Sequence, residues 1–300
     1  MKTATAIEPS ALPLERNLTM TDFAELVKAR LTTLVLITTA VGFYLGWQGP
    51  MNYLALLHAV LGTALAAASA AALNQWWEHK LDALMQRTLT RPIPAGRLSP
   101  RDALLTGLLL GGSGIIYLAL AVNTLCAVLA GLTVALYLFA YTPLKKISTA
   151  NTLVGAIPGA IPPVIGWVAA RGEIDAGAWS LFVILFIWQM PHFFALAWMY
   201  REDYARGGFR MMSSDDPTGL RSSSQSVLFC ILLLIVSGLP SYVGLTNILY
   251  LPIALALSGW FVAVAMRFHR ERSHAHARAL FLTSITYLPL LLAALVLTKE

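Results

Sequence analysis

The sequence is poor in charged residues, which make up only 12% of its 300 positions. A typical soluble domain carries about 25% charged residues, and the mean hydropathy here is +0.68. A chain this apolar cannot cover a water-facing surface, so the composition predicts a protein that folds in lipid. It also excludes a disordered chain, a collagen-like fibre and a nucleic-acid-binding domain.

Cysteine is scarce as well, and a cleavable leader is not apparent. Cys126 and Cys230 lie inside apolar runs, so no disulfide framework is expected. Residues 1–30 are polar and lack the apolar core of a signal peptide. The net charge of +6 therefore has to be interpreted first as a signal of membrane topology.

Six long intervals contain no Asp, Glu, Lys or Arg. One spanning helix needs about 20 apolar residues, so the three longest intervals are expected to hold two helices each. Breaks near their middles, at 48–50, 122–124 and 238–247, support this division. The intervals are 31–77, 103–144, 147–170, 176–200, 222–266 and 279–298. The sequence thus predicts an all-α polytopic membrane protein with nine transmembrane helices.

Lysine and arginine fall almost entirely on one side of these helices. Nineteen of the 21 precede the first helix or follow an even-numbered one, which leaves Arg171 and Lys299 on the other side. Loops rich in Lys and Arg face the cytoplasm. We therefore expect a cytoplasmic N-terminus and a periplasmic C-terminus, with residues 1–30 as a cytoplasmic segment and 31–298 as one domain.

Two helix starts carry capping signals. Ser99, Pro100 and Asp102 are expected to begin the third spanning helix as N-cap, first residue and acidic third residue. Asp22 followed by Glu25 is expected to open a short amphipathic helix before the first span in the same way.

A polar stripe ends the predicted second span. Asn74, Glu78 and Asp82 are spaced four residues apart, so a helix places them along one side. Two carboxylates and an amide oxygen suit Mg²⁺ shared with substrate phosphates. Arg87, Arg91 and Arg97 follow as donors for phosphate oxygens. The alternative is an ordinary polar helix end, but polar groups at membrane depth are usually functional.

Other charged segments lie on the same side of the membrane. Glu202 and Asp203 stand beside Arg201 and Arg206 just past the sixth span. Lys145 and Lys146 follow the fourth span and are expected to neutralise a phosphorylated substrate, although alone they would be topology markers. Asp215-Asp216 is interpreted as a solvated loop, because Pro217-Thr218-Gly219 breaks any aspartate-rich motif.

Several stretches extend the pattern of the stripe. They are Arg87-Thr88, Arg91-Pro92-Ile93-Pro94-x-Gly96-Arg97, Tyr141-Thr142-Pro143-Leu144-Lys145-Lys146, 155–163 and Trp188-Gln189-Met190-Pro191-His192-Phe193-Phe194. Together with Asn74-x₃-Glu78-x₃-Asp82 they resemble the UbiA superfamily of intramembrane prenyltransferases, in its haem-farnesylating branch. Glu78 stands where many members have Asp, and Glu202-Asp203 replaces widely spaced aspartates. The ligands of any second Mg²⁺ therefore stay open.

The resemblance implies nine helices around a central cavity in the cell inner membrane, with the site at the cytoplasmic mouth. It implies farnesyl diphosphate and haem b as substrates, haem O and diphosphate as products, Mg²⁺ as cofactor and no nucleic acid. A downstream haem A synthase or terminal oxidase assembly is an implied partner. Asn74, Glu78, Asp82 and Asp203 are expected to act in catalysis through Mg²⁺. The expected diphosphate ligands are Lys80, Arg87, Arg91, Lys145, Lys146 and Arg206.

His192 is the expected haem-binding residue. At 100° per residue, His192, Met199 and Asp203 would share one face of a regular helix. Histidine can ligate haem iron, but it can equally hydrogen-bond to a neighbouring helix.

Two other functions remain open from the sequence. One is prenylation of an aromatic acid or a quinone precursor, and the other is a membrane carrier of haem or lipid. A carrier needs polar residues through the full membrane depth. Here the polar residues gather at one face, which favours an enzyme.

Overall fold

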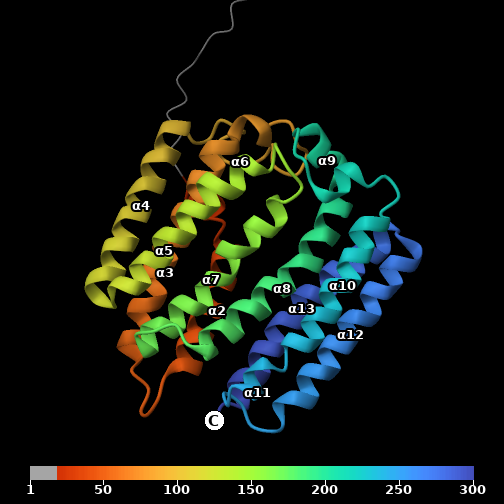
Figure 1. Ribbon diagram of the computed structural model, residues 1–300. Helices are drawn as coiled ribbons and strands as arrows, with labels where there is room; N and C mark the ends of the chain where they lie inside the picture. Colours follow the sequence, from red (N-terminus) through yellow and green to blue (C-terminus); the bar gives the residue numbers. More distant parts are fainter. Residues whose placement is uncertain (1–18) are drawn as a thin grey trace, which may run out of the picture.

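Nine helices in the described part of the chain, residues 19–300, are long and apolar enough to span a membrane, as predicted. The computed structural model shows them as a bundle of roughly parallel rods (Figure 1). The helices are α1(Met20–Leu26), α2(Ala29–Gly46), α3(Tyr53–Asp82), α4(Pro100–Ala121), α5(Thr124–Ala135), η1(Leu136–Tyr141), α6(Thr142–Leu144), α7(Asn151–Arg171), α8(Ala176–Met199), α9(Arg201–Arg206), η2(Met212–Asp215), α10(Leu220–Val236), α11(Leu239–Tyr242), α12(Tyr250–Glu271) and α13(His274–Leu297). Residues 1–18, with Lys2 and Arg16 of the predicted cytoplasmic segment, lie outside the described residues.

Neighbouring helices in the sequence are mostly neighbours in space. Helix α3 packs on α4, α7 packs on α8, and α12 packs on α10 and α13. Other contacts join distant parts of the chain, since α2 packs along α7 and α13 packs on α8 and touches α2. The start of α2 lies at the same end of the bundle as the end of α3, as the hydrogen bond between Lys28 and Asn74 shows.

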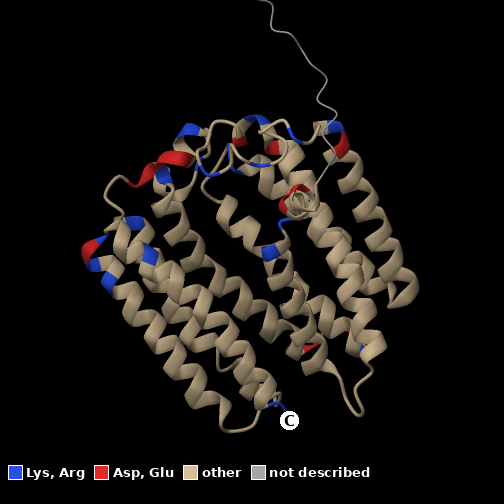
Figure 2. Cartoon of the chain, turned by 180° about the vertical axis from the view of Figure 1, so that it is seen from behind, with Lys and Arg blue, Asp and Glu red and all other residues tan. Residues whose placement is uncertain are grey.

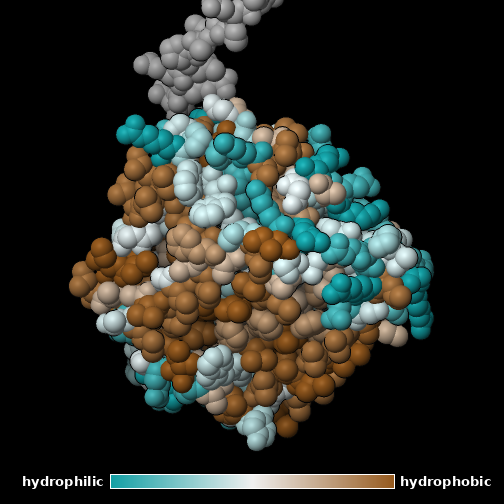
Figure 3. Space-filling view, turned by 45° about the horizontal axis from the view of Figure 1, so that its top comes forward, coloured by the Kyte–Doolittle hydropathy of each residue, from teal (hydrophilic) through white to brown (hydrophobic). Residues whose placement is uncertain are grey.

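The outer surface matches the lipid environment that the composition predicts. Large apolar side chains are exposed along the helices, for example Leu109 and Leu120 of α4 and Ile235 of α10. Figure 3 shows a broad hydrophobic face below a polar rim. Lys, Arg, Asp and Glu gather mainly at the upper end and upper flank of the bundle in Figure 2. Few of them lie at the opposite end.

One capping prediction is confirmed and the other is wrong. Ser99 Oγ accepts the Asp102 backbone N–H at 3.1 Å, and Pro100 begins α4 as predicted. The first helix starts three residues earlier than expected, because Thr19 is the N-cap and Asp22 is the third residue. Thr19 and Asp22 form the reciprocal capping box that we had assigned to Asp22 and Glu25.

Glycine allows α2 and α7 to approach backbone to backbone. A Cβ on Gly166 of α7 would lie 1.9 Å from the Thr39 carbonyl oxygen of α2. Conversely, a Cβ on Gly42 of α2 would lie 2.0 Å from the carbonyl oxygen of Pro163. Small residues at such crossings give membrane helices their packing energy, since lipid supplies no hydrophobic force between helices.

We predict that Gly166→Ala lowers the stability of the bundle by about 1–3 kcal/mol, because the added methyl group forces two backbones apart. Its apparent melting temperature in detergent should fall clearly below that of the wild type. Gly112→Ala is the matched control, since a Cβ at Gly112 meets nothing within 4 Å. Equal melting temperatures for the two variants would contradict the close contact.

Candidate active site

The predicted polar stripe lies along one side of the last three turns of α3. Asn74, Glu78 and Asp82 are 1%, 4% and 1% exposed, so all three are buried at the charged end of the bundle. Asn74 Nδ2 donates to Glu78 Oε2 at 2.9 Å, which joins two neighbours along the stripe. The predicted spacing therefore holds, and the side chains turn into the protein rather than toward headgroups.

Each residue of the stripe contacts one cation from another segment. Lys28 Nζ, just before α2, donates to Asn74 Oδ1 at 2.8 Å. Lys145 Nζ, after α6, donates to both Glu78 oxygens at 2.8 and 3.0 Å. From the loop between α3 and α4, Arg91 Nη1 donates to Asp82 Oδ2 at 2.6 Å. The stripe thus gathers three separate segments around two carboxylates.

The two lysines experience different electrostatic surroundings. Burial away from water, together with the nearby cations Arg91 and Lys145, lowers the pKa of Lys28 to about 7. Burial also disfavours the charged form of Lys145, but the Glu78 carboxylate outweighs this effect and raises its pKa. Burial and the neighbouring cations therefore disfavour the charged form of Lys28 more than Glu78 and Asp82 favour it. A bound anion would favour its protonated form.

A π-helical turn lies near the end of the fourth span, shortly before Lys145. This turn, η1, is followed at once by Thr142, whose Oγ1 donates to the Tyr137 carbonyl at 2.8 Å. The same Oγ1 accepts from Asn74 Nδ2 at 3.3 Å. Lys145 Nζ lies 4.5 Å from the centroid of the Tyr141 ring, within the range of a cation–π contact. Such π-helical turns are frequent at functional sites, and this one aims Lys145 at the stripe.

The second acidic segment is fixed by the loop that follows the stripe. Asp203 on α9 accepts the backbone N–H of Gln86 at 3.1 Å and is also bonded to Arg206. Burial opposes the charge of Asp203, but the hydrogen bonds from Arg206 and Gln86 outweigh it and lower its pKa. The Arg87 guanidinium lies 5.4 and 5.3 Å from the Tyr200 and Tyr204 ring centroids. The loop after α3 therefore joins both acidic segments.

The remaining predicted phosphate ligands are at the surface or engaged elsewhere. Lys80, Arg87, Lys146 and Arg206 are exposed, and Arg206 pairs with Asp203. Arg97 does not point at the stripe, because it forms ion pairs with Asp22 and Glu25 of α1. Only Arg91 and Lys145 of the predicted cations contact the stripe directly.

His192 lies against α13. Its Nδ1 is 2.7 Å from Ser284 Oγ, and its ring stacks on Trp188 with 5.3 Å between centroids. The Ser284 hydroxyl already donates its proton to the Phe281 carbonyl at 2.5 Å. When the Ser284 proton goes to the Phe281 carbonyl, Nδ1 is the donor to Ser284 Oγ, since a hydroxyl has one proton to give. Nε2 then carries the lone pair that could ligate a metal.

The predicted common face of His192, Met199 and Asp203 assumed one regular helix, and the structure interrupts that helix between Met199 and Asp203. Helix α8 ends at Met199, and Tyr200 has φ −108° and ψ 23°, so α9 is a separate short helix. The phase of α8 therefore does not determine where Asp203 points. No Gly or Pro stands at this break, so no local residue pattern indicates it.

Lys28 is the site residue that sequence reasoning missed. We counted it only as a topology marker, because it stands at the edge of the first charge-free interval. Its backbone is left-handed, with φ 48° and ψ 53°, which is uncommon outside glycine. Nothing in the residue type announces this conformation, so only the fold brings Lys28 to Asn74.

The donor set of the stripe fits Mg²⁺ that is shared with a substrate. Among residues 19–300, no three His, Cys, Asp or Glu side chains come together as a self-contained metal site. Mg²⁺ commonly uses only one or two carboxylates and takes its other ligands from water and phosphates. Glu78 and Asp82 provide this partial set, together with Asn74, which lies one turn before Glu78 on the same helix.

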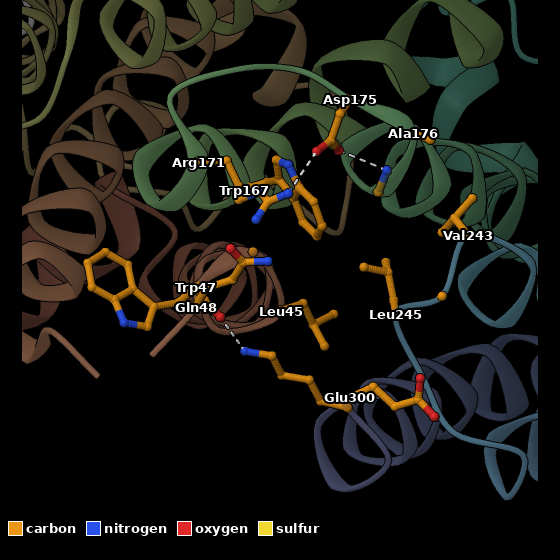
Figure 4. A pocket seen from close by; sticks show the side chains of 14 residues that line it. Leu45, Trp47, Gln48, Trp167, Arg171, Asp175, Ala176, Val243, Leu245 and Glu300 are labelled. Carbon is orange, nitrogen blue, oxygen red and sulfur yellow. Dashed lines mark hydrogen bonds and ion pairs between the residues drawn. The ribbon is translucent and has the colours of Figure 1, made fainter. Parts of the chain in front are cut away.

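A separate cavity of about 300 Å³ lies at the opposite end of the bundle. Figure 4 shows Trp47, Trp167, Arg171 and Asp175 around it, beside the segment that contains Leu245. Lys299 Nζ also lines it and donates to the Tyr44 and Trp47 carbonyls at 2.7 and 2.6 Å. This end has mixed charges, from Arg171, Asp175, Lys299 and Glu300, and differs in this from the buried stripe at the other end.

Comparison with known proteins agrees with this geometry. Residues 35–290 match the model of the UbiA prenyltransferase family. The chain is 44% identical to a protoheme IX farnesyltransferase of Solibacter usitatus (strain Ellin6076), across 93% of this chain and 99% of that protein.

Two solved structures share the fold. One is described as a digeranylgeranylglyceryl phosphate synthase and has a TM-score of 0.78 at 15% identity, covering 93% of this chain and 98% of that one. The other is a UbiA homologue from Archaeoglobus fulgidus bound to GPP and Mg²⁺, with a TM-score of 0.63 at 16% identity. It covers 91% of this chain and 99% of that one. The family match and the close relative together show that this chain belongs to the UbiA prenyltransferase family.

Proposed function

We propose that the protein transfers the farnesyl group of farnesyl diphosphate to a vinyl group of haem b. Addition of water completes the reaction, which gives haem O and diphosphate. The relative from Solibacter usitatus, 44% identical over nearly its full length, carries the name of this activity. The observation that carries the proposal is the stripe of Asn74, Glu78 and Asp82 with a cation on each member.

The reaction needs a stabilised leaving group. The allylic C–O bond breaks when diphosphate departs with the bonding electrons, so donors must meet the charge that develops on its oxygens. Lys28, Lys145 and Arg91 already point toward one region from three directions. We assign them as the main diphosphate ligands, and Arg87 and Arg206 as ligands nearer the α9 side. Exposed Lys80 and Lys146 then attract the anionic substrate from the surface.

Asn74, Glu78, Asp82 and Asp203 would hold Mg²⁺ with the diphosphate. When bound, the metal would neutralise diphosphate charge and so favour its departure. A UbiA homologue of the same fold has been solved with GPP and Mg²⁺, which supports a divalent metal here. The cations that now pair with the stripe would be released to phosphate oxygens, so the same side chains serve both states.

The acceptor then attacks the farnesyl carbon. The π electrons of the haem vinyl group form the new C–C bond, and the cation left beside the porphyrin takes up water and loses a proton. Apolar walls would enclose the farnesyl chain and exclude bulk water until that step. We assign His192 to haem, because Ser284 engages Nδ1 and leaves Nε2 as the ring nitrogen that could bind iron.

We also propose the orientation of the protein in its membrane. The basic loops at the site end favour a position in the cell inner membrane with the site toward the cytoplasm and the C-terminus outside. Residues 31–298 would form one catalytic domain preceded by a cytoplasmic segment. A downstream haem A synthase or terminal oxidase assembly would receive the product.

Incubation of the purified protein with haem b, farnesyl diphosphate and Mg²⁺, with products identified by mass, tests the proposed function. A mass that corresponds to farnesyl plus water on haem is expected. Product on an aromatic acid or a quinone precursor, but not on haem, would favour another acceptor. Movement of haem or lipid across vesicles without any product would indicate a carrier.

We predict that Glu78→Gln and Asp82→Asn each reduce turnover at least about 100-fold, because each removes an anionic metal ligand at constant size. Asp203→Asn should also reduce turnover. Glu202→Gln is the matched control, since the Glu202 side chain is 81% exposed. Mass-detected haem product and the apparent melting temperature are measured for all four. Near-normal turnover in both Glu78→Gln and Asp82→Asn would refute the carboxylate assignment.

We predict that Lys145→Ala raises KM for farnesyl diphosphate at least about tenfold, because a charged hydrogen bond to phosphate is lost. Lys146→Ala should have a smaller effect of the same kind, since Lys146 is exposed and Lys145 contacts Glu78 directly. KM for haem should change little in either variant. Equal losses for both substrates would indicate a general effect on folding instead.

We predict that His192→Ala weakens haem binding and shifts the Soret band in an optical titration. Ser284→Ala should cause a smaller change, because it removes only the partner that fixes the ring nitrogen. Haem affinity, Soret band and turnover that all match the wild type would leave His192 with a purely structural role.

A further inference from the structure

Arg97 is tied to the N-terminal helix rather than to the stripe. Its Nε donates to Asp22 Oδ1 at 2.6 Å, and its Nη2 donates to Glu25 Oε2 at 2.9 Å. The same Nη2 donates to the Thr90 carbonyl at 2.9 Å. One guanidinium therefore joins α1 to the loop that also carries Arg91.

Two further contacts fix α1 at its C-terminal end. Gln75 Nε2 on α3 donates to the carbonyls of Glu25 and Leu26, both at 2.8 Å. The Leu26 side chain is fully buried and packs with Ile93 and Leu98 of the same loop. These contacts hold the last turn of α1 directly beside the stripe, because Gln75 is the residue after Asn74.

Helix α1 depends on these contacts for its position. It has only seven residues, and isolated helices shorter than about 12 residues are marginal in water. The chain then turns at Lys28, whose backbone is left-handed with φ 48°. A non-glycine residue persists there only where its surroundings determine the conformation. Release of α1 would therefore let Lys28 leave the left-handed region and withdraw its ammonium group from Asn74.

We propose that Arg97 is a positioning residue for the prenyl diphosphate, because it holds α1 so that Lys28 reaches the diphosphate site. This inference rests on the proposed function, which makes Lys28 a diphosphate ligand. Arg97 itself touches neither the stripe nor the substrate. It acts through Asp22 and the short helix, which explains why two arginines in one loop have different partners: Arg91 contacts Asp82, and Arg97 contacts α1.

The central experiment is a double-mutant cycle with Arg97→Ala and Lys28→Ala. Each single variant should weaken binding of inorganic diphosphate with Mg²⁺, measured by calorimetry, by about tenfold. If Arg97 acts through Lys28, the double variant binds no more weakly than Lys28→Ala alone, because coupled residues are not additive. Losses that multiply in the double variant would overturn the proposal.

Two more measurements separate positioning from general destabilisation. Hydrogen exchange over residues 19–28 should rise in Arg97→Ala, while the apparent melting temperature changes little. Arg97→Lys should recover part of the affinity, because a lysine can keep the Asp22 ion pair. Arg101→Ala is the matched control, an exposed arginine on α4, and should leave both exchange and binding unchanged. Unchanged exchange in Arg97→Ala would overturn the proposal.

Failure of the proposed function would be seen separately. Diphosphate binding and hydrogen exchange are measured without haem, so they report on Arg97 even if the acceptor is a different molecule. In the full assay, Arg97→Ala should raise KM for farnesyl diphosphate and leave KM for the acceptor nearly unchanged. Normal diphosphate binding in Lys28→Ala would overturn the inference, because Arg97 would then have nothing to position.

Discussion

Two buried carboxylates on one helix determine how the charged end of this protein is built. Glu78 and Asp82 are almost completely inaccessible, and a buried charge without a partner costs several kcal/mol. Lys145 and Arg91 meet this requirement from two connecting segments, and Lys28 adds a third cation through Asn74. The fold at this end is thus organised around charge compensation, while the rest of the bundle is organised around close helix packing.

The same arrangement suits a substrate that brings its own negative charge. Side chains that are paired within the protein can exchange those partners for phosphate oxygens and metal without moving far. The second acidic segment is joined to this cluster by backbone contacts through Gln86 rather than by a direct link to the stripe. The loop after α3 therefore supports both acidic segments. Of its arginines, Arg91 contacts Asp82 of the stripe and Arg97 contacts α1.

The sequence predicted the parts of this structure that depend on regular spacing. Charge-free intervals predicted nine spans because lipid tolerates few charges, and a four-residue repeat predicted the stripe because helices have 3.6 residues per turn. Lys28 was not found, and Arg97 was assigned to phosphate rather than to α1, since the partners of both residues depend on where a seven-residue helix packs. The break at Tyr200 was missed because neither glycine nor proline marks it. Residues whose orientation depends on irregular backbone are beyond such periodic reasoning.

The break at Tyr200 separates two parts of the protein that a continuous helix would couple. A residue inserted into α8 before His192 would rotate the rest of that helix by about 100°. The insertion would therefore redirect the His192 side chain. Asp203 would keep its place, because Gln86 fixes it from the loop after α3. Sequence change around His192 can therefore accumulate without disturbing the end of the bundle that holds Asp203. If the proposed function holds, a fold of this kind can diversify its acceptor while its prenyl donor site stays constant.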